Sequence, residues 1–245
     1  MKRLAIQSYC FREFKDNAKV ASMVKELGLS GIEVCAVHAD FQKPADFDSV
    51  ISTYASAGVP VVSIGVNNIG TDEAAARNIF SFAKKAGCTA MSVNFKLEGI
   101  DKSLALCDKL TEEFGIKAGI HNHGGRHWLG NREALDWVFA RSSKRIGLSL
   151  DTAWAMDARE NPVDMIRAYA DRLHLMHLKD FLYKPDRTPE DVPIGSGNLK
   201  LAEAVKALEE IKFAGQLIIE YEGNPADPMP ALSACVKTVK AALKM

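Results

Sequence analysis

The sequence predicts an α/β protein built as a single (β/α)8 TIM barrel, on three observations. The chain has 245 residues, 47% of them hydrophobic, and that is enough to bury the core of one barrel of about 250 residues. Short β-branched apolar segments alternate with longer amphipathic segments, and eight such pairs run from one end to the other. No segment rich in Pro, Ser or charge interrupts the alternation, so we expect one domain over residues 1–245.

Each apolar segment is short enough for a parallel strand that is covered on both faces. We expect strands at residues 3–9, 31–35, 59–66, 90–95, 117–122, 145–151, 172–178 and 216–221. We expect helices near residues 16–27, 45–57, 71–86, 101–114, 131–141, 161–170, 198–211 and 227–243. An open doubly wound sheet is the alternative, but no G-x-G-x-x-G motif follows the first expected strand.

Start and stop residues support the helix boundaries. Asp72 and Asn198 are expected to begin the third and seventh helices, and Asn161 followed by Pro162 is expected to begin the sixth. Glycines are expected to end four helices, since glycine readily adopts the left-handed conformation found there. These glycines are Gly28, Gly58, Gly87 and Gly115.

The connection over residues 180–197 breaks the regular spacing. It contains three prolines and two glycines and is too long for an ordinary turn between a strand and a helix. Because it follows the seventh strand, we expect it on the catalytic face of the barrel, as an irregular lid or substrate-shaping loop. A variable surface insertion is the alternative.

Charge and cysteine content exclude several classes of protein. Thirty-one basic and 31 acidic residues give a net charge of zero, so we expect no nucleic-acid partner. Five cysteines without a C-x-x-C pair favour reduced thiols in the cytoplasm over a disulfide framework or a cysteine zinc site. The apolar stretch at the start is too short for a signal peptide, and no apolar run reaches the roughly 18 residues of a membrane span.

Ionisable residues end several of the expected strands. Parallel strands bring their carboxyl ends to one face of a barrel, so these side chains should converge. Alternation along each strand places His121 on the same side as Gly119, and His177 on the same side as Leu175, facing inward. Buried carboxylates and imidazoles together are best explained by a shared metal ion, although one such residue alone is more often a cap or loop acceptor. The residues are Glu33, His121, His123, Asp151, His177 and Glu220.

Several motifs together carry a family resemblance. GIHNHG, LSLDTAW, HLMHLKD, PIGSGNL and IIEYEGN, in that order, resemble the sugar isomerase/epimerase superfamily with a xylose-isomerase-like barrel. Ketose epimerases, hydroxypyruvate isomerases and inosose dehydratases belong to that group. The resemblance implies one divalent metal ion held by a Glu, an Asp, a His and a Glu after strands five to eight. The matching positions here are His121, Asp151, His177 and Glu220.

Two residues depart from the family pattern. His121 stands where the epimerases have a Glu, so one of their two proton-transfer carboxylates is missing. Two imidazoles and two carboxylates suit Mn, Co, Zn or Fe better than Mg, and the pattern leaves open whether His121 or His123 is the ligand. Trp154 stands where many relatives have a His, and its ring could either face the sugar or pack beneath the loop.

The predicted function is a metal-dependent isomerase or epimerase of a small sugar or sugar-like polyol, acting through an enediolate. Glu220 or His123 is the expected base, and Lys179 is expected to stabilise negative charge. Glu33, Trp154 and Asp180 are expected to contact or position the substrate, Asp180 by orienting Lys179 or His177.

Three alternatives stay open at this point. The same constellation supports dehydration of a keto-polyol, because an enediolate can expel a neighbouring hydroxyl as water. An endonuclease acting on abasic DNA shares the barrel but needs more metal ligands and a basic surface. The non-catalytic alternative is a sugar-binding barrel that has lost its second proton-transfer group. The oligomeric state is open, and a homo-oligomer is compatible with this fold.

Overall fold

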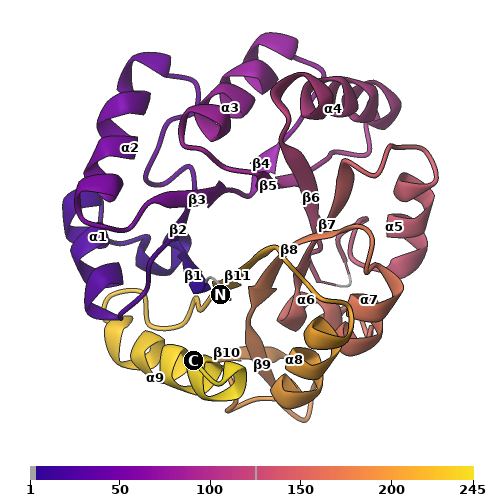
Figure 1. The fold of residues 1–245 in the computed structure, drawn as a ribbon. Helices are drawn as coiled ribbons and strands as arrows, with labels where there is room; N and C mark the ends of the chain where they lie inside the picture. The colour runs from indigo at the N-terminus through magenta and orange to yellow at the C-terminus, as the bar shows by residue number, and fades with distance from the viewer. Residues whose placement is uncertain (1–3, 125) are drawn as a thin grey trace.

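A computed structural model describes residues 4–124 and 126–245 and shows the expected barrel, with strands at the centre and helices around them (Figure 1). Nine parallel strands form one sheet in the order β3-β2-β1-β11-β8-β7-β6-β5-β4. Arg3, in the first expected strand, lies outside the described residues. The strands are β1 (Leu4–Gln7), β2 (Ile32–Val34), β3 (Val61–Ile64), β4 (Asn67–Asn68), β5 (Ala90–Asn94), β6 (Lys117–His121), β7 (Ile146–Asp151), β8 (Leu173–Leu178) and β11 (Gln216–Ile219).

The two edges of this sheet are joined within one short stretch of chain. β3 pairs with β2, whereas β4, three residues further on, pairs with β5. The expected strand over residues 59–66 is therefore shorter than predicted: β3 ends at Ile64, and β4, which was not predicted, begins at Asn67 after the chain has passed from one neighbour to the other. This step brings the sheet to a nearly closed barrel and excludes the open doubly wound alternative.

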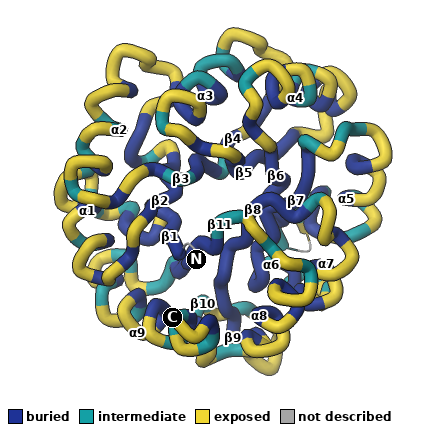
Figure 2. The backbone as a smooth tube through the Cα atoms, in the orientation of Figure 1, coloured by how far each residue is buried: buried dark blue, intermediate teal, exposed yellow. Residues whose placement is uncertain are grey.

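The helices surround the barrel and bury one face each, as the change from blue strands to yellow outer turns shows (Figure 2). Gly28, Gly58, Gly87 and Gly115 all have φ between 68° and 78°, as expected for glycines that end helices. The helices are α1 (Asn17–Glu26), α2 (Phe47–Ser56), α3 (Glu73–Lys85), α4 (Ile100–Phe114), α5 (Arg132–Phe139), α6 (Thr152–Asp157), α7 (Pro162–Ala168), α8 (Leu201–Glu210) and α9 (Met229–Leu243). Short 3-10 helices lie at Ser8–Phe11 and Pro44–Asp46.

Two of the three expected helix starts are confirmed. Asp72 accepts the Ala75 amide, and Asn161 accepts the Val163 amide with Pro162 at the first turn. The expectation for Asn198 is wrong, because α8 begins at Leu201. The Asn198 side chain instead accepts the Tyr183 amide at 3.1 Å, so it is used to fasten the preceding loop.

That loop is a β-hairpin and not the irregular segment that its prolines suggested. β9 (Asp180–Tyr183) pairs antiparallel with β10 (Pro189–Val192), so two of the prolines lie outside the strands and one begins β10. The Asp180 carboxylate accepts backbone amides of Gly195, Gly197 and Leu199 at 2.8–3.0 Å. These bonds fix the return from the hairpin to α8.

The interior of the barrel is apolar at one level and polar at the next. Leu175 and Ile218 form a small cluster with Ala5 and Ala90 inside the ring of strands. They alternate with residues that pack outward into the main core. His177 lies two residues beyond Leu175 on the same side of β8, so the expected inward orientation follows.

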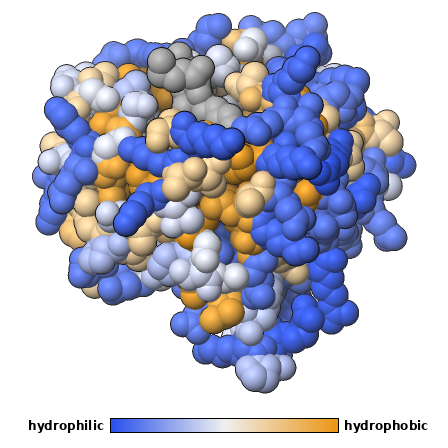
Figure 3. Space-filling model, turned by 60° about the horizontal axis from the view of Figure 1, so that its bottom comes forward, coloured by the Kyte–Doolittle hydropathy of each residue, from blue (hydrophilic) through white to orange (hydrophobic). Residues whose placement is uncertain are grey.

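The outer surface is mainly hydrophilic, with apolar side chains gathered in the middle of the face shown in Figure 3. Among the described residues, no helix combines the length and apolar character that a membrane span requires.

Candidate functional site

Four ionisable side chains from neighbouring strands meet at the carboxyl end of the barrel. His121 ends β6, Asp151 ends β7, His177 lies near the end of β8, and Glu220 follows β11. All four are buried, and one ligand atom from each lies within 4.8 Å of the others. The parallel register produces this meeting, since Asp151 stands opposite His177, and His177 opposite Ile218.

One atom of each side chain faces a common point. The Nε2 atom of His121 lies 3.1 Å from His177 Nδ1, 3.7 Å from Asp151 Oδ2 and 3.9 Å from Glu220 Oε2. His177 Nδ1 lies 2.5 Å from Glu220 Oε2. Two imidazole nitrogens and two carboxylate oxygens therefore form a compact donor set.

The Asp151 carboxylate tests whether a cation fits this set. Its Oδ1 atom accepts the Trp154 amide, but its Oδ2 atom is buried and has no hydrogen-bond partner among the described residues. Burial, reinforced by the negative charge of Glu220 and opposed by Lys179, raises the pKa of Asp151 to about 7. A buried carboxylate oxygen without a partner is costly, and a divalent cation at the common point would compensate it. The residues fit such an ion.

The imidazole of His121 is suited to the same role. Burial, together with the neighbouring His177 and His123, lowers its pKa well below the ordinary value and keeps the ring neutral. A neutral imidazole offers the lone pair that a metal ligand requires. Nitrogen and carboxylate donors together favour Mn, Fe, Co or Zn over Mg.

Glu33 lies behind His177 and not in contact with the cavity. Its Oε1 atom is 3.0 Å from His177 Nε2 and accepts the Gln7 side-chain amide at 2.5 Å, while Ser92 donates to its Oε2. Burial lowers the pKa of His177, but the charges and hydrogen bonds of Glu33 and Glu220 raise it well above its ordinary value. A carboxylate on the second ring nitrogen commonly orients a metal-binding histidine. These contacts place Glu33 against His177 and not among the residues that line the cavity described below, and its role toward the substrate stays a prediction.

Lys179 is buried beside the cluster, with 1% of the residue exposed. Its ammonium lies 3.5 Å from Glu220 Oε1 and 3.3 Å from Asp191 Oδ2, and it contacts Glu222 Oε1 as well. Burial disfavours the charge, yet these carboxylates and Asp151 raise the Lys179 pKa above its ordinary value. The ammonium also lies 5.4 Å and 5.7 Å from the ring centroids of Trp154 and Phe181, and the expected role of Lys179 in stabilising negative charge on the substrate stays a prediction. Asp180, predicted to orient Lys179 or His177, directs its carboxylate to the loop amides described above.

A cavity of about 380 Å³ opens beside the cluster and is large enough for a small ligand. Four of the predicted site residues are among those that line it: His121, His123, Trp154 and Glu220. The ring centroid of His123 lies 4.6 Å from that of His121 and 6.3 Å from that of Trp154, and within the part of the chain that the structure describes its buried Nδ1 atom has no hydrogen-bond partner.

Three further polar or aromatic lining residues were missed by the sequence analysis: Gln7, Tyr9 and Glu222. Alternation could have found Glu222, which lies two residues beyond Glu220 in IIEYEGN. Gln7 and Tyr9 end the first expected strand with the same spacing, but neither was an ionisable residue of the kind that drew attention to the other strand ends.

Comparisons with known proteins agree with this barrel. A model of the Xylose isomerase-like TIM barrel family matches residues 21–239. An inosose dehydratase of Clostridium beijerinckii is 26% identical over 137 residues, covering 50% of this chain and 46% of that protein, so the chain spans about half the length of the curated relatives it matches.

Two solved structures share the fold at low sequence identity. A sugar phosphate isomerase/epimerase from Parabacteroides distasonis superimposes with a TM-score of 0.76 at 16% identity, covering 98% of this chain and 96% of that one. A D-psicose 3-epimerase from Clostridium cellulolyticum gives 0.74 at 15% identity, covering 98% and 99%. With the family model matching most of its length, this chain belongs to the Xylose isomerase-like TIM barrel family.

Proposed function

We propose that the protein is a metal-dependent isomerase or epimerase of a small sugar or sugar-like polyol. One observation carries the proposal: two nitrogens and two oxygens converge within 4.8 Å beside a cavity, and one of those oxygens, on Asp151, is buried with no hydrogen-bond partner in residues 4–124 and 126–245. His121, Asp151, His177 and Glu220 would hold one divalent ion, Mn, Co, Zn or Fe in preference to Mg. When bound, the ion would polarise a substrate carbonyl and stabilise negative charge on its oxygen.

The cavity residues supply the proton transfers. Glu220 and His123 both line the cavity and are the candidate pair. One removes the proton from the carbon beside the carbonyl, which leaves an enediolate, and the other delivers a proton to the neighbouring carbon or to the opposite side of the same carbon. The first outcome is isomerisation and the second is epimerisation. Trp154 offers an aromatic face to the apolar side of the sugar.

Dehydration is the second candidate, favoured by the match to inosose dehydratases. An enediolate with a hydroxyl on the next carbon can form a double bond to that carbon as the C–O bond breaks. The departing hydroxyl takes up a proton from the cavity and leaves as water. The same residues serve both reactions until this step.

The experiment is a substrate screen in deuterated water with protein stripped by a chelator and reloaded with Mn²⁺, Co²⁺, Zn²⁺ or Mg²⁺. Ketoses, aldoses and inososes are incubated and followed by mass spectrometry. Isomerisation or epimerisation installs solvent deuterium in the product without loss of water, whereas dehydration removes the mass of one water. Metal and sugar binding without any exchange would refute catalysis and favour a binding protein. Reloading that restores no metal content would refute the metal site itself.

A further inference from the structure

Lys179 connects the hairpin to the candidate metal cluster. Its side chain is 1% exposed and lies among carboxylates from two parts of the chain. Glu220 and Glu222 follow β11, whereas Asp191 belongs to β10 of the hairpin. A buried ammonium requires such partners, so its position is set by the balance among them.

The two oxygens of Glu220 face different partners. Oε1 is 3.5 Å from the Lys179 ammonium. Oε2 is 2.5 Å from His177 Nδ1 and 3.9 Å from His121 Nε2, within the donor set. One carboxylate therefore lies between a fixed cation and the place of the proposed metal ion, and the two positive charges compete for it.

Asp191, on the hairpin, is another carboxylate in contact with that fixed cation. Its Oδ2 atom is 3.3 Å from Lys179 Nζ and accepts the Glu222 amide at 3.2 Å. Its Oδ1 atom is buried without a hydrogen-bond partner among the described residues, so Lys179 and the Glu222 amide, both at Oδ2, are the contacts that hold this carboxylate. With Glu222, it supplies two negative charges to one ammonium.

We propose that Asp191 is a positioning residue for the metal centre. It holds the Lys179 charge toward the hairpin and away from Glu220, so that metal binding and docking of the β9–β10 hairpin stabilise each other. The inference rests on the proposed metal site. Because coupling between two equilibria is reciprocal, a bound ion must tighten the hairpin as much as the docked hairpin tightens the ion.

The test compares Asp191→Asn with Asp186→Asn, both on the hairpin. The first removes the charge facing Lys179 with little change in shape. The second removes an exposed charge in the turn, where an amide oxygen can still accept the Thr188 amide as Asp186 does. Mn²⁺ affinity is measured by competition with a chelating dye. Asp191→Asn should bind Mn²⁺ about tenfold more weakly than wild type, and Asp186→Asn should bind it unchanged.

Hydrogen exchange tests the reverse direction. In wild type, Mn²⁺ should slow exchange at the backbone amides of β9 and β10, and in Asp191→Asn this slowing should be lost. Equal Mn²⁺ affinity in wild type and Asp191→Asn would overturn the inference. So would a fall in Tm that is the same with and without Mn²⁺, since that is the result of a purely structural role. A wild type that binds no Mn²⁺, Co²⁺ or Zn²⁺ would instead refute the proposed function, and this inference with it.

Discussion

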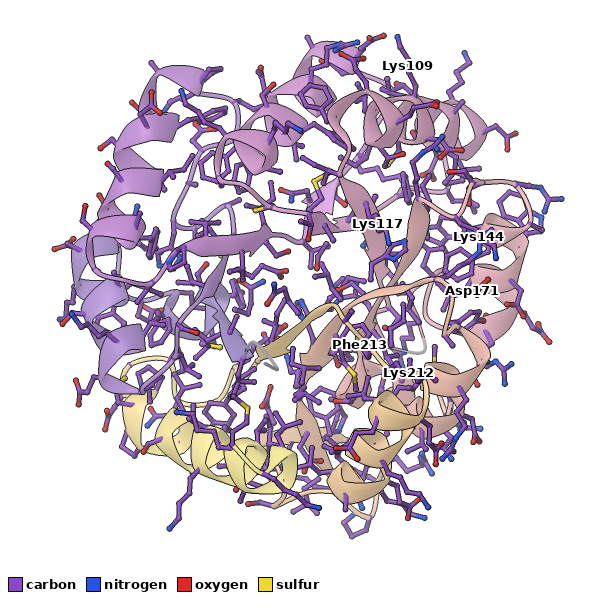
Figure 4. All side chains as sticks on the ribbon, viewed as in Figure 1. Lys109, Lys117, Lys144, Asp171, Lys212 and Phe213 are labelled. Carbon is purple, nitrogen blue, oxygen red and sulfur yellow. The ribbon has the colours of Figure 1, made fainter. Side chains whose placement is uncertain are left out.

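The two ends of the barrel differ in how far their charged side chains are exposed to solvent. Where the strands begin, charged side chains lie in solvent: Lys144 and Asp171 form an ion pair with side chains that are 69% and 61% exposed. Lys117, Lys144, Asp171 and Lys212, labelled in Figure 4, lie at or shortly before the starts of β6, β7, β8 and β11. Where the strands end, Asp151 and Glu220 are buried with side-chain exposures of 0% and 8%. Only the buried charges are costly enough to call for a bound cation.

Strand β8 contains both environments within four residues. His174 faces outward, and its Nε2 atom hydrogen-bonds the Lys144 carbonyl at 3.1 Å, while burial lowers its pKa to about 4. His177 faces inward, and carboxylates lie at both of its ring nitrogens. The residue type is the same in both places, and the partners distinguish a structural histidine from a candidate ligand.

The largest effect is expected from Asp151→Asn. A carboxamide can still accept the Trp154 amide but lacks the charge that a divalent ion requires, so metal affinity should fall at least about 100-fold. The metal-free protein should keep its Tm, because the variant also removes a buried charge. Elemental analysis after dialysis and thermal unfolding check the two parts. A folded variant with one ion per chain would show that Asp151 is not a ligand.

Arg172→Met should lower the stability of the fold and leave metal affinity unchanged, the reverse of what is expected for Asp151→Asn. The Arg172 guanidinium lies at the strand-start end and donates to backbone carbonyls at 2.7–3.2 Å, so its loss should cost about 3 kcal/mol of unfolding free energy. The accepting residues are Phe139, Ser142, Ser143 and Ile146. Urea unfolding measures the loss, and metal affinity of the folded fraction should not change. A lower metal affinity in this variant would show that the two ends of the barrel are not independent.

Glu33→Gln should have an intermediate effect. The variant keeps the size of the side chain but removes the charge that orients His177, so metal affinity should fall about tenfold. Chelator competition measures it, with Glu112→Gln, an exposed ion-pair partner of Arg145, as the matched control. Wild-type affinity in Glu33→Gln would mean that His177 does not need this carboxylate.

The smallest effect is expected from Asp171→Asn. The exposed pair with Lys144 is screened by water, so unfolding free energy should change by less than about 1 kcal/mol, and metal affinity should not change. Urea unfolding in low and high salt is the measurement. A larger loss would indicate that the strand-start end depends on its surface charges more than their exposure suggests.

Local patterns in the sequence identified most of the barrel and its polar end. The strands that carry Asp151 and His177 are short, mainly apolar segments, and each begins one residue after its expected start and ends where expected. The break between β3 and β4 could not be read, because it depends on a change of neighbour from β2 to β5. Helix α6 was missed because six residues after a strand show too little of a helical period.

The site was less completely predictable than the fold. Lys179 has the position of a catalytic residue in HLMHLKD, but its partners Asp191 and Glu222 come from distant segments. The contact between Glu33 and His177 could not be predicted either, since only the folded chain brings the two residues together. Position at a strand end predicts that a residue is near the cavity, while its role depends on contacts that no local pattern encodes.

The start of α6 fixes the orientation of the Asp151 carboxylate. One of its oxygens is committed to the helix backbone, so the other has little rotational freedom left to lose when a ligand arrives. The carboxylate is already ordered when the chain folds, so binding an ion adds little further loss of conformational entropy. Uptake of an ion at this corner is therefore expected to be limited by shedding of the ion's own hydration water and not by rearrangement of the chain.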